Sequence, residues 1–192
     1  MVRGTKVATV LSLRAICITL GTRPRCGILR GTRHLFLTCV ILTKRLVTQL
    51  ENLGIEFVAA GELATKLNHT DAILDAIFGF SFSGEPRDPF KSALEAIIAA
   101  QKKDNLPIVS VDIPSSWGVD SGRGESVLSQ SFVPDVLISL TAPKIGSRTF
   151  TGRHWLGGRF VDAPTAEKYD LKLPRYPGTS QVVDVTGVQP CM

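Results

Sequence analysis

The sequence predicts an α/β fold, with a parallel sheet that carries helices on both of its faces. Three observations lead to this prediction. From about residue 46 onward, apolar runs typical of buried strands alternate with helical patterns, as in chains that form parallel sheets. Three of the apolar runs end in polar turns that contain glycine or proline. The length of 192 residues is enough for one domain with a sizeable core.

The first predicted elements lie between residues 46 and 78. Leu46, Val47, Leu50 and Leu53 have the spacing of one helical face, and Gly54 is a natural helix stop. The segments that follow are predicted as a short strand, a short helix or turn and a buried strand, at residues 55–60, 61–70 and 76–78.

The clearest predicted helix covers residues 89–103. Pro89 begins it, its apolar side chains share one face, and Lys102 and Lys103 end it favourably for the helix dipole. Three more strands are predicted after it, at residues 106–114, 135–143 and 157–164, the last of them at an edge of the sheet.

The charge distribution divides the chain into two parts. Nine of the 22 Lys and Arg residues precede Glu51 and no Asp or Glu does, so the rest of the chain has more acid than base. We expect no nucleic-acid partner, because that function needs a basic face on the folded domain. No apolar run has the roughly 18 residues of a membrane span, so no membrane partner is expected. The four cysteines lack metal-binding spacing and favour a reducing compartment.

Three polar turns follow predicted strands, at Gly79–Glu85, Asp112–Ser116 and Thr141–Lys144. Ligands of parallel α/β sheets bind beyond the carboxyl ends of the strands. We therefore expect the three turns to converge on one cleft.

Several residues in and before these turns have chemistry suited to a site. Asp75 precedes a loop of Gly and Ser, whose small residues let backbone N–H groups approach an anionic ligand, although such loops are also common as plain turns. Asp112 either acts as a general base, holds a ribose hydroxyl, or only caps the strand end. Lys144 either pairs with a phosphate or is solvated, as most loop lysines are.

Other catalytic classes have weaker support. Ser115 and Ser116 have no His nearby in the sequence and lack the flanking glycines of a nucleophile elbow, which disfavours a serine hydrolase. No Gly-x-Gly-x-x-Gly follows a predicted strand, which disfavours an ordinary NAD-dependent oxidoreductase. His34, His69 and His154 have no metal-ligand spacing and are interpreted as surface or structural residues.

Five blocks, in order, carry a resemblance to a known family: DAIFGFSFSGEPRDPF, PIVSVDIPSSWGV, PDVLISLTAPKIGS, FTGRHWLGGRFV and YDLKLPRYPGTSQVV. Residues 46–183 resemble the NAD(P)H-hydrate epimerases, also called the YjeF N-terminal-domain or apolipoprotein-A-I-binding-protein family. The resemblance implies a Rossmann-like three-layer fold. It also implies an isomerase that interconverts the R and S forms of hydrated NADH and NADPH for repair by a partner dehydratase, with a potassium ion in the site.

The resemblance assigns roles to individual residues by motif position. Asp75 and Ser115 match potassium ligands, and Asp112 matches the site aspartate and is the expected catalytic acid or base. Ser116 departs from the family, which usually has glycine there, and its side chain is expected to crowd the cation loop. The segment expected to hold the hydrated nucleotide, together with Asp112, consists of Gly79, Phe80, Ser81, Phe82, Ser83, Gly84 and Glu85.

The family's glycine-rich loop, Gly-Pro-Gly-Asn-Asn-Gly-Gly-Asp-Gly, is absent ahead of the first matching helix. Codons for residues 1–11, read one base early, permit Gly-Pro-Gly-Asn-Lys-Gly-Gly-Asp-Gly-Leu. We therefore expect the first strand and glycine loop to be missing or replaced, and residues 1–45 to be an out-of-frame translation of that region. The alternatives are a mitochondrial transit peptide, which is Arg-rich and acid-poor, and a genuinely divergent segment.

The predicted organisation is an aberrant, poorly structured segment at residues 1–45, a YjeF N-terminal-like domain at 46–183 and a tail at 184–192. The resemblance further implies a homodimer and a cytoplasmic or mitochondrial location. A missing first strand would expose a sheet edge, so we expect this chain to be poorly soluble or partly unfolded. Because the glycine-rich loop is absent, we also expect the chain to be impaired as an enzyme. The alternative function is a non-catalytic binding or interaction protein on the same scaffold.

Overall fold

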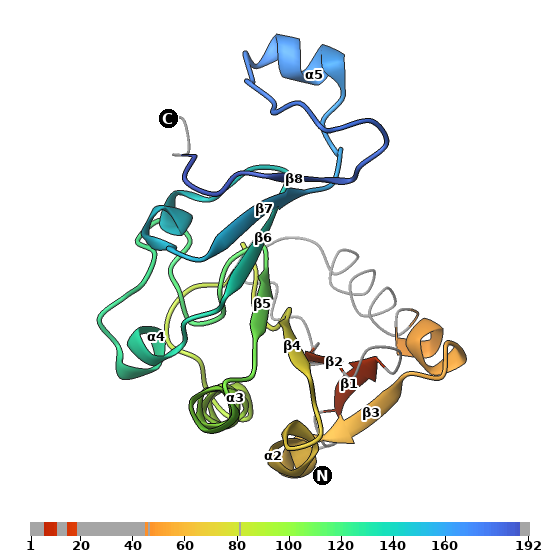
Figure 1. Cartoon of the computed structure of the whole chain (residues 1–192), viewed down its shortest axis with the longest axis vertical. Helices are drawn as coiled ribbons and strands as arrows, with labels where there is room; N and C mark the ends of the chain where they lie inside the picture. The colour runs from red at the N-terminus through yellow and green to blue at the C-terminus, as the bar shows by residue number, and fades with distance from the viewer. Residues whose placement is uncertain (1–5, 11–14, 19–44, 46, 81, 189–192) are drawn as a thin grey trace, which may run out of the picture.

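One sheet organises the computed structural model, which describes residues 6–10, 15–18, 45, 47–80 and 82–188 (Figure 1). In these ranges eight strands follow the order β3-β1-β2-β4-β5-β6-β7-β8. The strands are β1 (Lys6–Val10), β2 (Ala15–Ile18), β3 (Glu56–Ala59), β4 (Ala72–Asp75), β5 (Ile108–Val111), β6 (Val136–Leu140), β7 (Arg153–Gly157) and β8 (Val182–Asp184). The helices are α2 (Leu63–Leu67), α3 (Phe90–Asp104), α4 (Val127–Ser131) and α5 (Ala163–Lys168), with 3-10 turns η1 (Ala60–Glu62) and η2 (Ile145–Thr149).

The five neighbouring strands β2, β4, β5, β6 and β7 run parallel. Strands β4, β5 and β6 are mostly apolar and none of their side chains is exposed, as in a sheet covered on both faces. Figure 1 shows α2, α3 and α4 on one side of the sheet and the helix at residues 47–52 on the other. The predicted three-layer α/β architecture is confirmed. Antiparallel pairs complete it, since β1 joins β2 to β3 and β8 pairs with β7.

The N-terminal segment supplies two of the strands. β2 lies parallel to β4, with Ala15 opposite Ala72 and Ile18 opposite Asp75. The expectation of an unpaired sheet edge beside β4 is therefore wrong, because that edge is occupied. A ladder of backbone hydrogen bonds needs only an extended chain, so many different sequences can form a strand at this edge. The domain limits at residues 45 and 183 stay a prediction.

Helix α3 covers the centre of the sheet and begins directly after Pro89, as predicted. Its buried face contributes Ala93, Leu94, Ile97 and Ile98 to the main hydrophobic cluster. Each buried Leu or Ile stabilises the fold by about 1.5–3 kcal/mol relative to an exposed one. The earlier helix, at residues 47–52, stops at Gly54 as predicted, where φ is +71. No helix in the described residues is long and apolar enough to cross a membrane.

Two predicted strand positions are wrong. The strand expected at residues 76–78 is β4, which ends at Asp75. The apolar run continues past it because Ile77 and Phe78 pack against the core from the following loop. The strand expected at residues 157–164 is β7, and Gly158, with φ +82, ends it. The edge beyond β7 is filled by β8, which the sequence analysis missed.

Candidate functional site

The three predicted turns meet at the carboxyl ends of β4, β5 and β6. The backbone N–H of Phe80, after β4, donates to Asp112 Oδ2 at 2.8 Å. Lys144, after β6, forms an ion pair with Asp112 Oδ1 at 2.6 Å. Asp112 itself follows β5 directly. One carboxylate thus joins all three loops, so the predicted meeting of the turns is confirmed. That they form one cleft stays a prediction.

The backbone at these strand ends is strained. Asp112 has a φ of +74, which non-glycine residues rarely adopt, and its N–H donates to the carbonyl of Ile138 at 2.8 Å. Thr141, directly after β6, has a φ of +67. Such conformations cost on the order of 1–3 kcal/mol each and concentrate at functional sites. Two of them on adjacent strands mark this edge of the sheet as the candidate site.

The Lys144 side chain is mostly buried and is held in the site by three polar contacts. It is only 15% exposed, and Nζ also donates to the carbonyls of Leu140 at 2.8 Å and Ala142 at 3.3 Å. The alternative of a solvated loop lysine is therefore wrong. Because the ammonium group is fixed by two carbonyls of its own loop, it fixes the Asp112 carboxylate in turn.

Gly79 permits the close approach of Asp112. A Cβ at this position would lie 3.0 Å from Asp112 Oδ2, so a side chain would push the carboxylate away from the Phe80 N–H. The loop is fixed further by stacking of Phe78 on Phe82, whose ring centroids are 3.8 Å apart. The glycine thus favours the observed position of the Asp112 carboxylate.

The predicted nucleotide-binding segment is partly open to solvent. The Phe80 side chain is 69% exposed, and Ser83, Gly84 and Glu85 are exposed as well, whereas Phe82 is half-buried. Ser81 lies outside the described residues. Phe80, Ser83, Gly84 and Glu85 are therefore accessible to solvent in the loop that contacts Asp112. Their role in ligand binding stays a prediction.

Asp75 ends β4 as a fully buried side chain that accepts four hydrogen bonds. Ser115 Oγ and the Ile77 N–H donate to Oδ1, at 2.6 and 3.3 Å. Ser110 Oγ and the Ser115 N–H donate to Oδ2, at 2.7 and 3.0 Å. The two residues predicted as cation ligands are thus in direct contact. The sequence analysis missed Ser110, although a polar residue inside an apolar strand was an available signal.

The Asp75 carboxyl resists ionisation. Burial raises the pKa of Asp75 above its ordinary value of 3.8, because desolvation of the charged form outweighs the hydrogen bonds that act in the opposite direction. No charge from the described basic side chains contributes to this balance. A buried carboxylate without a counter-charge favours a proton or a bound cation.

The donor set fits a hard cation such as potassium. The carboxylate of Asp75 and the hydroxyl of Ser115 are oxygen ligands, and the buried anion has no neutralising partner among the described residues. No cluster of three His, Cys, Asp or Glu side chains that could hold a metal occurs within the described ranges. Oxygen ligands of this kind suit a hard cation better than a soft transition metal.

Ser116 is strained and its hydroxyl is unpaired. Its φ is +79, and its buried Oγ has no hydrogen-bond partner in the part of the chain that the structure describes. A side chain in the left-handed region costs on the order of 1–2 kcal/mol, and a buried unsatisfied hydroxyl about 1–3 kcal/mol. The backbone here is one that glycine adopts without cost. That Ser116 crowds the cation loop stays a prediction.

We predict that Ser116→Gly raises the free energy of unfolding by about 1 kcal/mol or more, since it removes both the strain and the unpaired hydroxyl. Ser116→Ala is the matched control, because it removes the hydroxyl and keeps the strain. Urea unfolding should rank the glycine variant above the alanine variant and both above the parent chain. A glycine variant no more stable than the alanine variant would contradict the strain.

The two described histidines take a structural and a surface position, as was predicted for all three. His154 in β7 is buried, with Nε2 at 2.9 Å from Ser139 Oγ, and burial lowers its pKa. His69 is exposed, and His34 lies outside the described residues. Ser115 bonds to a carboxylate and not to a histidine. The site therefore has no serine-hydrolase triad among the described residues.

A family model and several curated proteins match this chain and indicate the same family. Residues 38–146 match the family model described as YjeF-related protein N-terminus. The chain is similar to proteins named NAD(P)H-hydrate epimerase. The protein of that name from Mycosarcoma maydis is 48% identical over 156 residues, and the match covers 78% of this chain and 57% of the relative. That of Puccinia graminis f. sp. tritici is 49% identical over 146 residues, 76% of this chain and 58% of the relative. The chain thus spans less than two thirds of the length of these relatives.

A solved structure shows the same fold. The crystal structure of the yeast protein YNL200c superposes with a TM-score of 0.65 at 35% identity, over 82% of this chain and 63% of the yeast chain. The family match covers more than half of the 192 residues and includes Asp75, Asp112, Ser115 and Lys144. The chain belongs to the YjeF-related N-terminal family.

Proposed function

We propose that the chain is an isomerase that interconverts the R and S forms of hydrated NADH and NADPH. The names of its relatives, at 48–49% identity, support this reaction. The observation that carries the proposal within this molecule is the cluster at Asp112. It combines a carboxylate, a paired lysine and a backbone N–H at the edge of the sheet where α/β proteins bind ligands.

Asp112 is the proposed catalytic acid or base. Inversion of one centre on the reduced nicotinamide ring requires a group to leave that carbon and return to it, and a positioned carboxylate accelerates such steps by about 10²–10⁴-fold. The ion pair with Lys144 and the Phe80 N–H orient the two carboxylate oxygens. Lys144 is a positioning residue in this proposal, because it acts on Asp112. The exposed part of Gly79–Glu85 is proposed to hold the hydrated nucleotide.

Potassium is the proposed cofactor, with Asp75 and Ser115 as ligands. When bound, the ion would supply the positive charge that the buried Asp75 carboxylate lacks among the described residues. It would also connect the loop after β4 to the loop after β5, which Ser115 already joins through its bond to Asp75 and the bond that it accepts from the Phe78 N–H. Its role in this proposal is structural and electrostatic.

We predict that potassium raises the unfolding temperature relative to tetramethylammonium at equal ionic strength, because a ligand that binds only the folded state stabilises it. Asp75→Asn should lose most of this increase. Asp71→Asn, an exposed aspartate four residues earlier, is the matched control and should keep it. Equal unfolding temperatures of the parent chain in the two salts would contradict a potassium site.

The proposal also includes a partner enzyme and an assembly state. An epimerase is useful to a dehydratase that accepts one epimer, because it converts the other epimer into that substrate, so we propose a functional partnership with such an enzyme. The homodimer implied by the family resemblance is proposed as the assembly state. Light scattering on the purified chain would measure it directly.

A second candidate function is non-catalytic binding on the same scaffold. It is favoured by the strained Ser116 beside the proposed cation ligand and by the absence of the family's glycine-rich loop. Under this alternative the chain would bind the hydrated nucleotide without converting it. The same features support the proposal that this exact chain is impaired.

Turnover separates these candidates. The purified chain is incubated with one epimer of hydrated NADPH, with and without potassium, and the other epimer is measured by NMR. A second protein, the restored chain, carries an in-frame family segment in place of residues 1–45. We expect the restored chain to interconvert the epimers and the parent chain to be slower. If neither protein converts an epimer in potassium, the epimerase proposal fails.

A further inference from the structure

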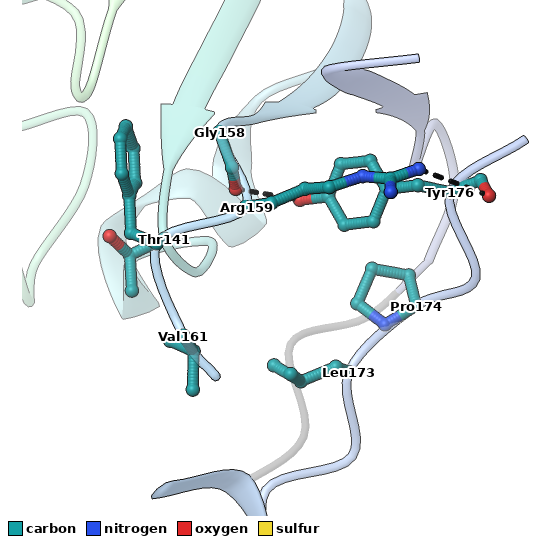
Figure 2. Close-up of a pocket in the computed structure, with 8 residues that line it drawn as sticks. Thr141, Gly158, Arg159, Val161, Leu173, Pro174 and Tyr176 are labelled. Carbon is teal, nitrogen blue, oxygen red and sulfur yellow. Dashed lines mark hydrogen bonds between the residues drawn. The ribbon is translucent and has the colours of Figure 1, made fainter. Parts of the chain in front are cut away.

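A cavity lies at the carboxyl ends of β6 and β7, and its lining includes the first residue of the Thr141–Lys144 turn. It has a volume of about 230 Å³, and its lining includes Thr141 on one side and Leu173 and Pro174 on the other. Figure 2 shows Thr141 and Val161 facing Leu173 and Pro174 across the opening. Thr141 begins the loop that ends in Lys144, so the cavity and the Asp112 cluster share one loop.

One wall of the cavity is held in place by a guanidinium–aromatic stack. The Arg159 guanidinium lies over the Tyr176 ring, 5.1 Å from its centroid, as Figure 2 shows. Arg159 also donates to the carbonyl of Gly178 at 2.7 Å, and the Tyr176 hydroxyl donates to the carbonyl of Gly158 at 3.1 Å. These contacts join residues 158 and 159 to residues 176 and 178, which lie 17 to 19 residues further along the chain. The cavity is a built feature of the fold.

The cavity also has an exposed aromatic ring. Phe160 lines it and is 68% exposed. A Cβ on Gly158 would collide with the Phe160 ring, and Gly158 has a φ of +82. Only glycine combines this backbone conformation with the space that the ring occupies. The cavity lining thus includes a mostly exposed aromatic side chain, which is suited to stacking a planar ring.

The size of the cavity restricts what it holds. Sites for whole drug-sized ligands measure about 300–1,000 Å³, so a cavity of about 230 Å³ is suited to one ring system of a larger molecule. The proposed substrate has two ring systems joined by phosphates. If its reduced nicotinamide lies at Asp112, the other ring must lie elsewhere, and this cavity adjoins the same loop.

We propose that this cavity binds the adenine ring of the hydrated dinucleotide, which stacks against Phe160 between the Thr141 loop and the 173–176 segment. This inference rests on the proposed function for the identity of the ligand. Arg159 and Tyr176 hold one wall of the cavity in place. The subsite adds affinity for the adenylate half and takes no part in the reaction at the nicotinamide.

The test uses adenosine monophosphate as the probe and ribose 5-phosphate as the ring-free control, with binding measured by titration calorimetry on the full chain. Adenosine monophosphate should bind more tightly than ribose 5-phosphate. Phe160→Ala should weaken it about five- to 100-fold, the range for loss of one stacked base. Phe160→Tyr should retain it. Tyr169→Ala removes an exposed aromatic that does not line the cavity and should have no effect.

Kinetics on the restored chain distinguish the two ends of the substrate. Phe160→Ala should raise KM for hydrated NADH without lowering kcat, and leave hydrated nicotinamide mononucleotide, which lacks adenine, unaffected. Equal adenosine monophosphate affinity in Phe160→Ala and the parent chain would overturn the subsite. A Phe160→Ala variant that changed KM only for hydrated nicotinamide mononucleotide would also overturn the subsite, because that result would place nicotinamide in the cavity. Phe160-dependent adenosine monophosphate binding without turnover would support the subsite and contradict the epimerase function.

Discussion

Asp112→Asn in the restored chain should lower kcat for epimer interconversion by about 10²–10⁴-fold, the usual contribution of a general acid or base. The variant keeps an oxygen that accepts from the Phe80 N–H, and it loses the charge that pairs with Lys144. The loss should therefore fall mainly on kcat and much less on KM. Rates of both variant and parent are measured by NMR of the two epimers.

The matched control is Asp120→Asn. Asp120 is an exposed aspartate on the connection that follows β5, eight residues after Asp112, and its substitution should leave the rate unchanged. Circular dichroism checks that Asp112→Asn is folded. An Asp112→Asn variant with the activity of the parent would show that another group moves the proton, and the role assigned to Asp112 would have to be abandoned.

Asp75 should dominate the pH dependence of stability. Asp75→Ala should cost about 3 kcal/mol of unfolding free energy, because it leaves three buried donors on Ser110 and Ser115, and the partly buried N–H of Ile77, without an acceptor. The parent side chain has a raised pKa in the folded state. Its contribution to stability is thus fully present below the unfolded-state value and is lost as the pH rises through the folded-state value.

Asp75→Asn is the comparison that isolates this titration, since it keeps the shape and removes the ionisable group. In potassium-free buffers from pH 3 to neutrality, the parent chain should lose stability relative to Asp75→Asn as the pH rises above about 4. Urea unfolding at each pH measures the difference, and groups common to both proteins cancel. A parent chain that instead gains stability relative to Asp75→Asn over this range would contradict the raised pKa.

The candidate site was predictable from sequence where polar residues follow buried strands. Asp112 and Ser115 follow β5, and parallel topology alone brings consecutive strand ends to one edge. Asp75 is the last residue of β4, and the roles of Asp75 and Ser115 as cation ligands came from the family resemblance. The role of Lys144 was left open, because its ion pair joins the loop after β6 to the end of β5 across 32 residues of sequence. A long-range pair of this kind has no local pattern.

The fold was less predictable where apolar residues leave the sheet. Ile77 and Phe78 continue the apolar run of β4 although they lie in a loop, because they also pack against the core. An apolar run shows that residues are buried, and it does not distinguish a strand from a loop that covers the core. The three-residue strand β8 carries too short a pattern to detect, and the cavity beside Arg159 depends on a stack with Tyr176, 17 residues away.

The most direct test of this account is a crystal structure of the restored chain with hydrated NADPH. The account predicts that the reduced nicotinamide ring lies between the Gly79–Glu85 loop and Lys144, with the hydrated carbon within reach of the Asp112 carboxylate. A ligand bound elsewhere on the chain, or a nicotinamide ring that Asp112 cannot contact directly or through one water, would contradict it.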